Sequence, residues 1–389
     1  MAGKSVGRVV LYFVVLVAAV VFLSSFSVAL WGEKPETLPE DAELIIQENM
    51  TIREFGEANG LSNPVLKEVF SLVTPEDKQG LLSSTDVPVE NLAVEVNKVL
   101  ALEPENVSIN RTRIVMKPGL WAVYLVAVFL LLRKGKITPR LRKGLLIGAV
   151  VLFGIILGAD PSPMGTVRDA IVLFGRTGVI IPQRIVAFGL MLAGGILLAN
   201  KFLCAWGCQF GTLQDLIFRL NRDSRDRRGI LPQVKVPFAL SNSIRIAFFV
   251  FMTTAAILWV FDVVNFIDPF KIFKPEFLGV TGIVSVSLLL IASLFVYRPW
   301  CHFLCPYGLV GWLVEKISIN RIHVDYESCI ACDACSKACP STAMEAILKR
   351  KKTIPDCFSC GTCIGVCPTQ SISFKKGKRL LPPPGKFGE

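Results

Sequence analysis

One cysteine spacing occurs twice near the end of this 389-residue chain: Cys329-Ile-Ala-Cys332-Asp-Ala-Cys335-Ser-Lys-Ala-Cys339-Pro340 and Cys357-Phe-Ser-Cys360-Gly-Thr-Cys363-Ile-Gly-Val-Cys367-Pro368. Three closely spaced thiolates on a tight loop can bind three corners of an iron–sulfur cube, while the fourth cysteine of the run reaches a second cube. The spacing therefore predicts two [4Fe–4S] clusters. The first would be held by Cys329, Cys332, Cys335 and Cys367, and the second by Cys357, Cys360, Cys363 and Cys339.

This doubled run is the one found in bacterial two-cluster ferredoxins, and it predicts a small α+β domain over residues 311–375. Eight cysteines could instead bind zinc or form disulfides. Zinc sites take four ligands each and do not need the additional Cys-x3-Cys-Pro reach. Disulfides need an oxidising compartment, which the predicted topology argues against. Iron–sulfur ligation is the interpretation that explains the whole pattern.

The composition indicates a membrane protein, since 52% of the residues are hydrophobic, only 19% are charged, and the mean hydropathy is +0.54. Soluble domains carry about 25% charged residues. The formal charge of +11 could suggest a nucleic-acid partner. No basic stripe interleaved with aromatic residues is present, however, so we expect no nucleic-acid binding.

The apolar stretches predict a mostly α-helical, polytopic bundle of about six spanning helices, at residues 9–30, 118–132, 141–158, 181–200, 244–262 and 280–297. A spanning helix needs about 20 apolar residues, and the second and third stretches are short for this. The first run lies in an N-terminal anchor, residues 1–31. Its Ser27-Val28-Ala29 also resembles a signal-peptidase site, so a cleaved signal is the alternative.

Loop charges predict the sidedness. Residues 133–143 carry six basic residues and no acidic one, and the loop after Lys201 is similarly basic, whereas the opposite loops are nearly balanced. Because Lys and Arg accumulate in cytoplasmic loops, we expect a multi-pass protein of a prokaryotic inner membrane with its ferredoxin domain in the cytoplasm.

The remaining domains follow from this topology. Residues 32–117 would form a small exoplasmic helical module, either a docking surface or a plain spacer, with helical spacing from Thr51 to Phe70, a turn at Asn63-Pro64 and a second segment from Val89 to Leu102. Residues 118–310 would form the membrane bundle. The segment Ser371–Phe374 is predicted to close the ferredoxin sheet, and the basic, Pro-rich tail 376–389 to be disordered near the lipid surface.

Four further cysteines form two matched pairs: Cys204-Ala-Trp-Gly-Cys208 and Cys301-His-Phe-Leu-Cys305. Aligning the pairs also aligns Phe210 with Tyr307, Gly211 with Gly308 and Arg219 with Lys316, so a parallel repeat of two helical hairpins is predicted. An i,i+4 spacing puts both thiols of a pair on one helix face. The two pairs could hold a third cluster or another metal, or form redox disulfides. They could also be four buried thiols that act as small apolar side chains.

With these motifs together, residues 118–370 resemble the membrane-bound ferredoxin-type quinol dehydrogenases that accompany periplasmic nitrate reductase, and the membrane half of nitrous-oxide-reductase maturation proteins. The resemblance matches Cys204, Cys208, Cys301 and Cys305 to two Cys-x3-Cys-Pro motifs, with Gln209 where proline is usual. It implies electron transfer between membrane quinol and a partner protein, or a complex subunit, through clusters.

The chain has only two histidines, His302 and His323, and no Cys-x-x-Cys-His, Gly-x-Gly-x-x-Gly or Walker loop. Haem and nucleotide sites of those types are therefore not expected. The sequence predicts an iron–sulfur electron-transfer protein that serves the quinone pool as a subunit of an oxidoreductase. The alternatives are a maturation or regulatory factor that supplies electrons or metal to a partner metalloenzyme, and a structural anchor.

Overall fold

The computed structural model describes residues 2–31, 111–178 and 182–387, together with parts of the segment 45–96. The chain divides into two compact units. One contains residues 1–31, 112–172 and 180–389, and the other contains residues 32–111 with 173–179. Each unit is described by itself.

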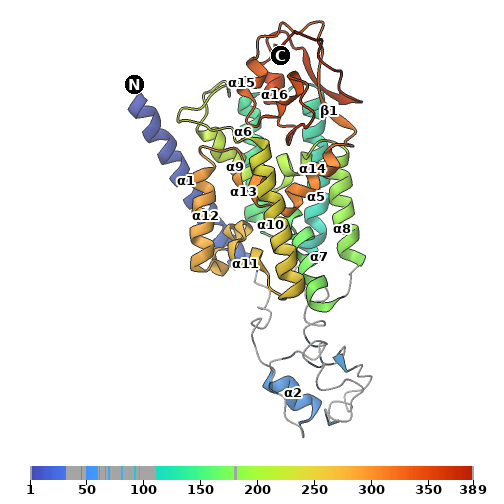
Figure 1. Cartoon of the computed structure of the whole chain (residues 1–389). Helices are drawn as coiled ribbons and strands as arrows, with labels where there is room; N and C mark the ends of the chain where they lie inside the picture. Colours follow the sequence, from blue (N-terminus) through green and yellow to red (C-terminus); the bar gives the residue numbers. More distant parts are fainter. Residues whose placement is uncertain are drawn as a thin grey trace. The chain divides into compact units, whose positions relative to one another are not determined.

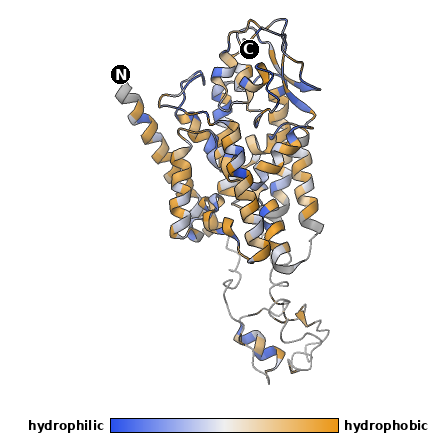
Figure 2. Cartoon of the chain, in the orientation of Figure 1, coloured by the Kyte–Doolittle hydropathy of each residue, from blue (hydrophilic) through white to orange (hydrophobic). Residues whose placement is uncertain are grey.

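Among the described residues, three helices are long and apolar enough to cross a membrane: α1 (Ala2–Trp31), α5 (Arg111–Arg133) and α10 (Phe238–Leu258). Apolar residues cover these helices in Figure 2, and side chains such as Phe22 and Leu30 of α1 are about 70% exposed. A helix satisfies its own backbone hydrogen bonds, so such a surface suits lipid. The chain is therefore a membrane protein, while six spans remain a prediction.

Two of the other expected spans are interrupted helices. The helix α6 (Pro139–Ala149) continues as the π-helix η3 (Val150–Ile156), and α8 (Pro182–Leu192) continues as the π-helix η4 (Ala193–Leu197). The last expected span contains the shorter apolar helix α12 (Val280–Ala292). A helix, α7 (Pro163–Thr177), also occupies a region that the sequence suggested was an outer loop.

The remaining helices of the first unit are short. They are η5 (Leu203–Gly207, π-type), α9 (Gln209–Leu220), α11 (Val263–Ile267), η6 (Pro269–Phe273) and η7 (Pro275–Phe277), both 3-10, α13 (Pro299–Phe303) and α14 (Pro306–Glu315). Figure 1 shows α9, α13 and α14 among the longer helices and beneath the C-terminal part of the chain. The two Cys-x3-Cys pairs lie on these short elements.

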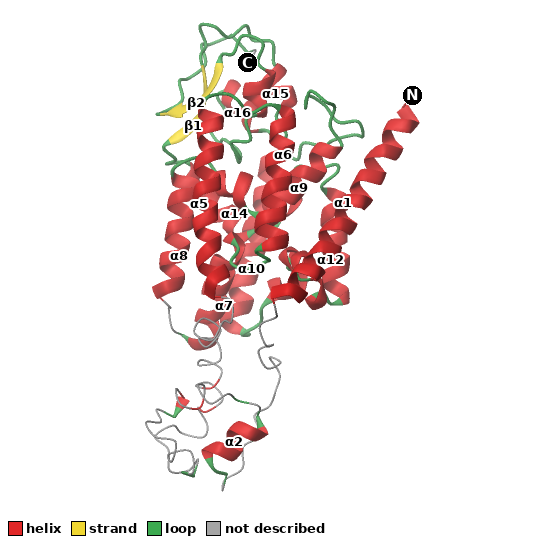
Figure 3. Ribbon diagram, turned by 180° about the vertical axis from the view of Figure 1, so that it is seen from behind, coloured by secondary structure: helices red, strands yellow, loops and turns green. Residues whose placement is uncertain are grey.

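The ferredoxin part forms a two-stranded antiparallel sheet of β1 (Asn320–Val324) and β2 (Ile372–Lys376), with Ile322 opposite Phe374. The strand β2 confirms that the segment near Ser371 closes this sheet. Three short helices complete the part: α15 (Ala334–Ala338), α16 (Ala343–Leu348) and α17 (Thr362–Val366). Figure 3 shows both strands beside the C-terminus. Phe374 packs edge-on against Phe129 of α5, which fixes the sheet to the bundle.

The prediction of a disordered tail is wrong for residues 376–387. Arg379 donates to the carbonyl of Ile322, Lys386 donates to the carbonyl of Tyr326, and the ring of Phe387 contacts that of Tyr326 at 6.1 Å. Composition alone misses this, because the tail has few apolar residues and gains its order from these contacts with the ferredoxin part.

The second unit contains the helix α2 (Ile52–Ala58) and its own small core. Thr51 and Glu54 form a reciprocal capping box, which fixes where the predicted helical segment begins. The apolar residues chosen from helical spacing are buried together: Ile52, Phe55, Leu66, Val69, Leu92 and Val96. The predicted turn at Asn63-Pro64 lies outside the described residues.

Candidate iron–sulfur centres

The first ferredoxin site is a small cavity in the C-terminal part of the chain. Its lining includes all four cysteines assigned to the first cluster, Cys329, Cys332, Cys335 and Cys367, with Val324, Ile372 and Phe387 beside them. Cys332 is exposed, so one edge of this site faces out.

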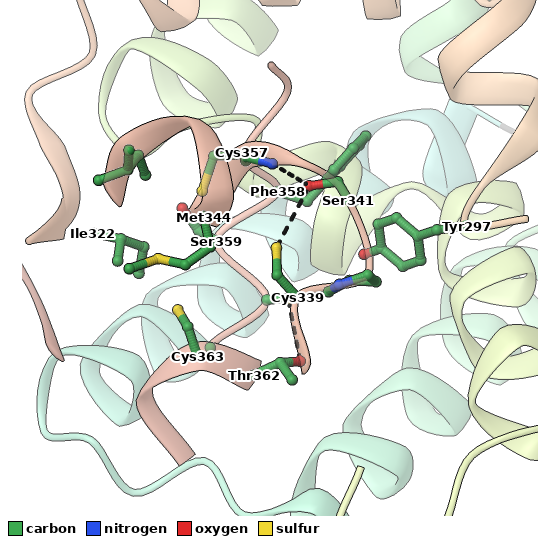
Figure 4. Close-up of a pocket in the computed structure, with 15 residues that line it drawn as sticks. Tyr297, Ile322, Cys339, Ser341, Met344, Cys357, Phe358, Ser359, Thr362 and Cys363 are labelled. Carbon is green, nitrogen blue, oxygen red and sulfur yellow. Dashed lines mark hydrogen bonds between the residues drawn. The ribbon is translucent and has the colours of Figure 1, made fainter. Parts of the chain in front are cut away.

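The second ferredoxin site is a cavity that is lined by the complementary set, Cys339, Cys357, Cys360 and Cys363. Figure 4 shows the thiols of Cys339, Cys357 and Cys363 gathered around it. The fourth cysteine of each run has crossed to the other cavity, which is the arrangement that the spacing rule requires. Within the described residues, no three His, Cys, Asp or Glu side chains converge on a site for a single metal ion.

The loops that carry the thiols share a backbone shape. Ala331 and Asp333 in the first loop have φ values of +52° and +55°, and Ser359 and Gly361 at the matching positions of the second have +46° and +74°. These left-handed residues turn the chain tightly around each cavity. A helix, α15 or α17, starts directly after each turn.

Burial raises the pKa of Cys335 to about 12, and burial followed by the charge of Glu315 raises the pKa of Cys357 to about 12. Free thiols here would remain protonated at neutral pH. Ligation by iron supplies the positive charge that a buried thiolate lacks. The two sets of four thiols and the positive charge that their thiolates require fit two [4Fe–4S] clusters.

The second site is fixed to the helical bundle by buried charges. Asp356, which precedes Cys357, pairs with Lys201 and Arg245, and all three side chains are at most 1% exposed. Burial raises the pKa of the Asp356 carboxyl, but the two cations outweigh this effect and hold that pKa at about 2. The carboxylate therefore stays charged and binds both cations at neutral pH.

A second buried group of charges holds the same site from another side. Arg142 donates through Nε to the carbonyl of Cys360 at 2.9 Å and pairs with Asp226. Arg222 donates to the carbonyl of Ala338, which precedes Cys339, at 2.9 Å and also pairs with Asp226. Asp226 thus joins the backbone contacts on two ligating segments.

The two Cys-x3-Cys pairs do not lie on continuous helices, which corrects the expected i,i+4 helix face. Cys204 lies in η5 and Cys301 in α13, while Cys208 and Cys305 leave the helix with ψ near +115° and begin α9 and α14. This break lets backbone N–H groups at the start of the next helix donate to the sulfur. Gly211 donates to Cys208, and Gly308 donates to Cys305.

The tertiary structure brings these four thiols together. Cys301 interacts electrostatically with Cys204, Cys208 and Cys305, and all four cysteines are buried. Neither Gly211 nor Gly308 can carry a Cβ, because it would lie 2.8 Å from the carbonyl oxygen of Cys204 or Cys301. The glycines are required by this close approach rather than by a turn.

Each pair is held by a cation from the other pair's segment. Lys201 donates to the carbonyl of Gly308 at 2.7 Å, and Arg298 donates to the carbonyls of Cys204 and Ala205. Both cations have left-handed backbones, with φ of +46° and +47°. Neither Lys201 nor Arg298 was predicted as part of this site. Their equivalent positions, each three residues before the first cysteine of its pair, are nevertheless visible in the sequence.

Side chains link this thiol group to the second ferredoxin site. Trp206, between Cys204 and Cys208, donates to the carbonyl of Ser359 at 3.3 Å. The ring of Phe358 lies 5.5 Å from that of His302 and 4.9 Å from the guanidinium of Arg298. Residues from the loop between Cys357 and Cys360 therefore contact both Cys-x3-Cys segments directly.

Known families match these same regions. Residues 321–368 match the model of a 4Fe-4S dicluster domain, and residues 181–228 and 278–323 match that of a 4Fe-4S binding domain. The putative electron transport protein YccM of Escherichia coli is 35% identical over 155 residues, which cover 37% of this chain and 43% of that protein. Over these regions the chain is therefore similar to iron–sulfur electron-transport proteins.

Two other relatives are more distant. The regulatory protein NosR of Pseudomonas aeruginosa is 25% identical over 55% of the chain and 31% of its own length. The ferredoxin-type methylamine utilization protein MauN of Methylorubrum extorquens is 26% identical over 50% of the chain and 62% of its own length. The chain thus spans less than two thirds of each relative. No solved structure matches it. The resemblance to membrane polyferredoxins is confirmed.

Proposed function

We propose that this protein passes electrons between the membrane quinone pool and a partner protein, as an oxidoreductase subunit of the quinol dehydrogenase type. The observation that supports this most is the direct contact of the second ferredoxin loop, through Phe358 and Ser359, with both Cys-x3-Cys segments. A redox centre in the bundle and one in the ferredoxin domain would be adjacent, with aromatic side chains between them.

The four thiols Cys204, Cys208, Cys301 and Cys305 are proposed as a third metal site, most simply a third cluster. They are gathered and buried, backbone N–H groups donate to two of them, and Lys201 and Arg298 place positive charge beside them. Cations and N–H donors both favour thiolate over thiol. When bound, each [4Fe–4S] cluster carries one electron at a time. Oxidation of a quinol to a quinone releases two electrons and two protons, so two such clusters can accept both electrons.

The proposed location is the inner membrane, with the ferredoxin domain on the cytoplasmic side and residues 32–117 outside. The basic loops at 133–143 and after Lys201 support this orientation. The thiols would then lie in a reducing compartment.

Metal content and redox titration test the proposal. Anaerobically purified protein should contain about twelve iron atoms and as many acid-labile sulfides per chain if all three sites hold a cube, against about eight for the ferredoxin pair alone. Cys204→Ser should lower twelve to about eight and leave the ferredoxin EPR signals unchanged.

Reduction by a quinol then tests the redox partner. A quinol analogue should reduce the clusters of the wild-type protein and should do so much more slowly in Cys204→Ser. Clusters that respond to dithionite but never to quinol or quinone would contradict the dehydrogenase role. That result would favour a factor that supplies electrons or metal to another enzyme.

A further inference from the structure

The two ferredoxin loops differ in the residues that stand between their cysteines. Ser359 and Thr362 line the second cavity, as Figure 4 shows, and each is 1% exposed. The matching positions of the first loop hold Ala331 and Ala334, which are partly exposed. The second site therefore has two buried hydroxyl groups at positions where the first site has methyl groups.

The contacts of the Thr362 hydroxyl indicate where its single hydrogen points. Nη1 of Arg219 lies 3.2 Å from the hydroxyl oxygen, and a guanidinium can only donate, so the oxygen accepts there. Sγ of Cys360 and Oδ2 of Asp226 each lie 3.4 Å from the same oxygen. An O–H···O bond measures about 2.5–3.0 Å, so the carboxylate is too far, whereas the larger sulfur atom accepts at this distance. Since a ligating thiolate has no hydrogen, Thr362 donates to Cys360.

The hydroxyl of Ser359 is available in a different way. Its oxygen has no hydrogen-bond partner among the described residues. A buried hydroxyl without a partner destabilises the fold, and the acceptors on this cavity include the thiolate sulfurs. Ser341, which lies 3.7 Å from Sγ of Cys339, differs because its hydroxyl already donates to the carbonyl of Asp356 at 3.2 Å. Ser359 and Thr362 are thus the hydroxyl donors of the second site.

Buried cations around the second site outnumber the buried anions. Six cations form ion pairs with only three carboxylates, and every one of these side chains is at most 3% exposed. The cations are Arg142, Lys201, Arg219, Arg222, Arg245 and Arg298, and the carboxylates are Asp215, Asp226 and Asp356. The sum stays positive even when Glu315, which accepts from the N–H of Cys357, is counted as an anion.

The surroundings of the first site have the opposite character. Among the described residues that line the first cavity, the charged one is Asp333, an exposed carboxylate. Cys332 is also exposed, so water reaches this site. Reduction of a cluster adds one electron and one negative charge, which nearby cations and hydrogen-bond donors favour and a carboxylate opposes. Burial alone disfavours the added charge. At the second site the buried positive excess opposes that penalty, and buried charges act more strongly than exposed ones.

We propose that Thr362 and Ser359 donate hydrogen bonds to sulfur atoms of the second site and, with the buried cations behind them, give the second cluster the higher reduction potential of the two. Thr362 transmits the positive charge of Arg219 to Cys360. An electron on the ferredoxin part then resides mainly on the inner cluster. The inference holds for any redox partner, so it does not depend on the proposed quinone reaction.

A potentiometric titration followed by EPR tests this order. Full-length Cys204→Ser protein is titrated anaerobically with dithionite and mediators, so that the two ferredoxin clusters give the signals. Thr362→Val removes the hydroxyl at similar volume. It should lower the higher of the two potentials by a factor of about ten in the reduction equilibrium, which is about 59 mV for a one-electron couple. Thr362→Ser keeps the hydroxyl and should restore the potential. Ser359→Ala should lower the same potential by less.

The matched controls place hydroxyls in the exposed loop. Ala334→Thr and Ala331→Ser should leave the lower potential within about a factor of two in the same equilibrium, because water already donates at the exposed site. Iron content is measured for every variant, and Ser359→Ala decides the question where Thr362→Val loses iron.

Three results would overturn the inference. They are a shift of the lower potential instead of the higher one, no shift in Thr362→Val and Ser359→Ala, and an equal fall of both potentials, which would indicate general damage. Failure of a quinol to reduce the wild-type clusters would contradict the proposed function and leave this order of potentials standing.

Discussion

The loops Cys329–Cys335 and Cys357–Cys363 share a cysteine spacing and a backbone shape, yet they lie in opposite surroundings. Ile330 in the first loop is 64% exposed, whereas Phe358 at the same position of the second is 4% exposed and contacts the bundle. The residue before the first loop, Ser328, is exposed, and its counterpart Asp356 is fully buried between two cations.

This difference teaches that ligation and placement are encoded by different residues. The cysteines and the left-handed turns make two equivalent cavities. The residues between and before the cysteines then decide that the second loop faces the membrane thiols and that the first faces outward. The second site is therefore the inner one, and the first is the more exposed one.

The largest expected effect comes from breaking the buried contact that distinguishes the inner loop. Asp356→Ala leaves the charges of Lys201 and Arg245 buried without a partner, which should destabilise the protein by about 3–5 kcal/mol. Chemical denaturation of the reconstituted protein measures this. The matched change Ser328→Ala should alter stability by less than about 0.5 kcal/mol. Similar losses in the two variants would contradict the comparison.

An intermediate effect is expected from the turn that both loops share. Gly361→Ala puts a Cβ at φ +74°, 2.8 Å from Leu132 of α5, so stability should fall by about 1–2 kcal/mol. Asp333 already holds a Cβ at the equivalent left-handed position on the exposed loop, so Asp333→Ala should cost less than about 1 kcal/mol. Thermal unfolding compares the pair. If the order were reversed, packing against α5 would not be what separates the loops.

The smallest expected effect concerns the cover of the outer site. A chain ending at Gly377 lacks Arg379, Lys386 and Phe387, of which Phe387 lines the first cavity. In air, the first cluster should then lose its absorbance about two to three times faster, since the cover is lost while the ligating loops remain. The second cluster should be unaffected. Leu381→Ala, at a residue that is 71% exposed, is the control. Equal bleaching of both clusters would show that the tail covers neither selectively.

Much of the candidate site was predictable because ligation is local. Each set of three cysteines spans one short loop, so spacing specified which thiols could meet, and the fourth followed from the crossing rule. The amphipathic core of the second unit and the strand near Ser371 were predictable for the same reason, since periodicity acts over a few residues. The helical face expected for the Cys-x3-Cys pairs was wrong, because spacing does not reveal that Cys208 and Cys305 end one helix and start another.

The sequence alone therefore determined the cysteine sets, the apolar helices and the membrane class, all of which depend on residues near each other in the chain. Only the tertiary structure decided that Lys201 reaches Asp356, 155 residues away, and that Arg298 reaches Cys204, 94 residues away. It also decided that the tail packs against the ferredoxin part. Charges buried in a bundle cost energy unless they are paired, and which partner each one finds depends on how distant helices pack, which no local pattern specifies.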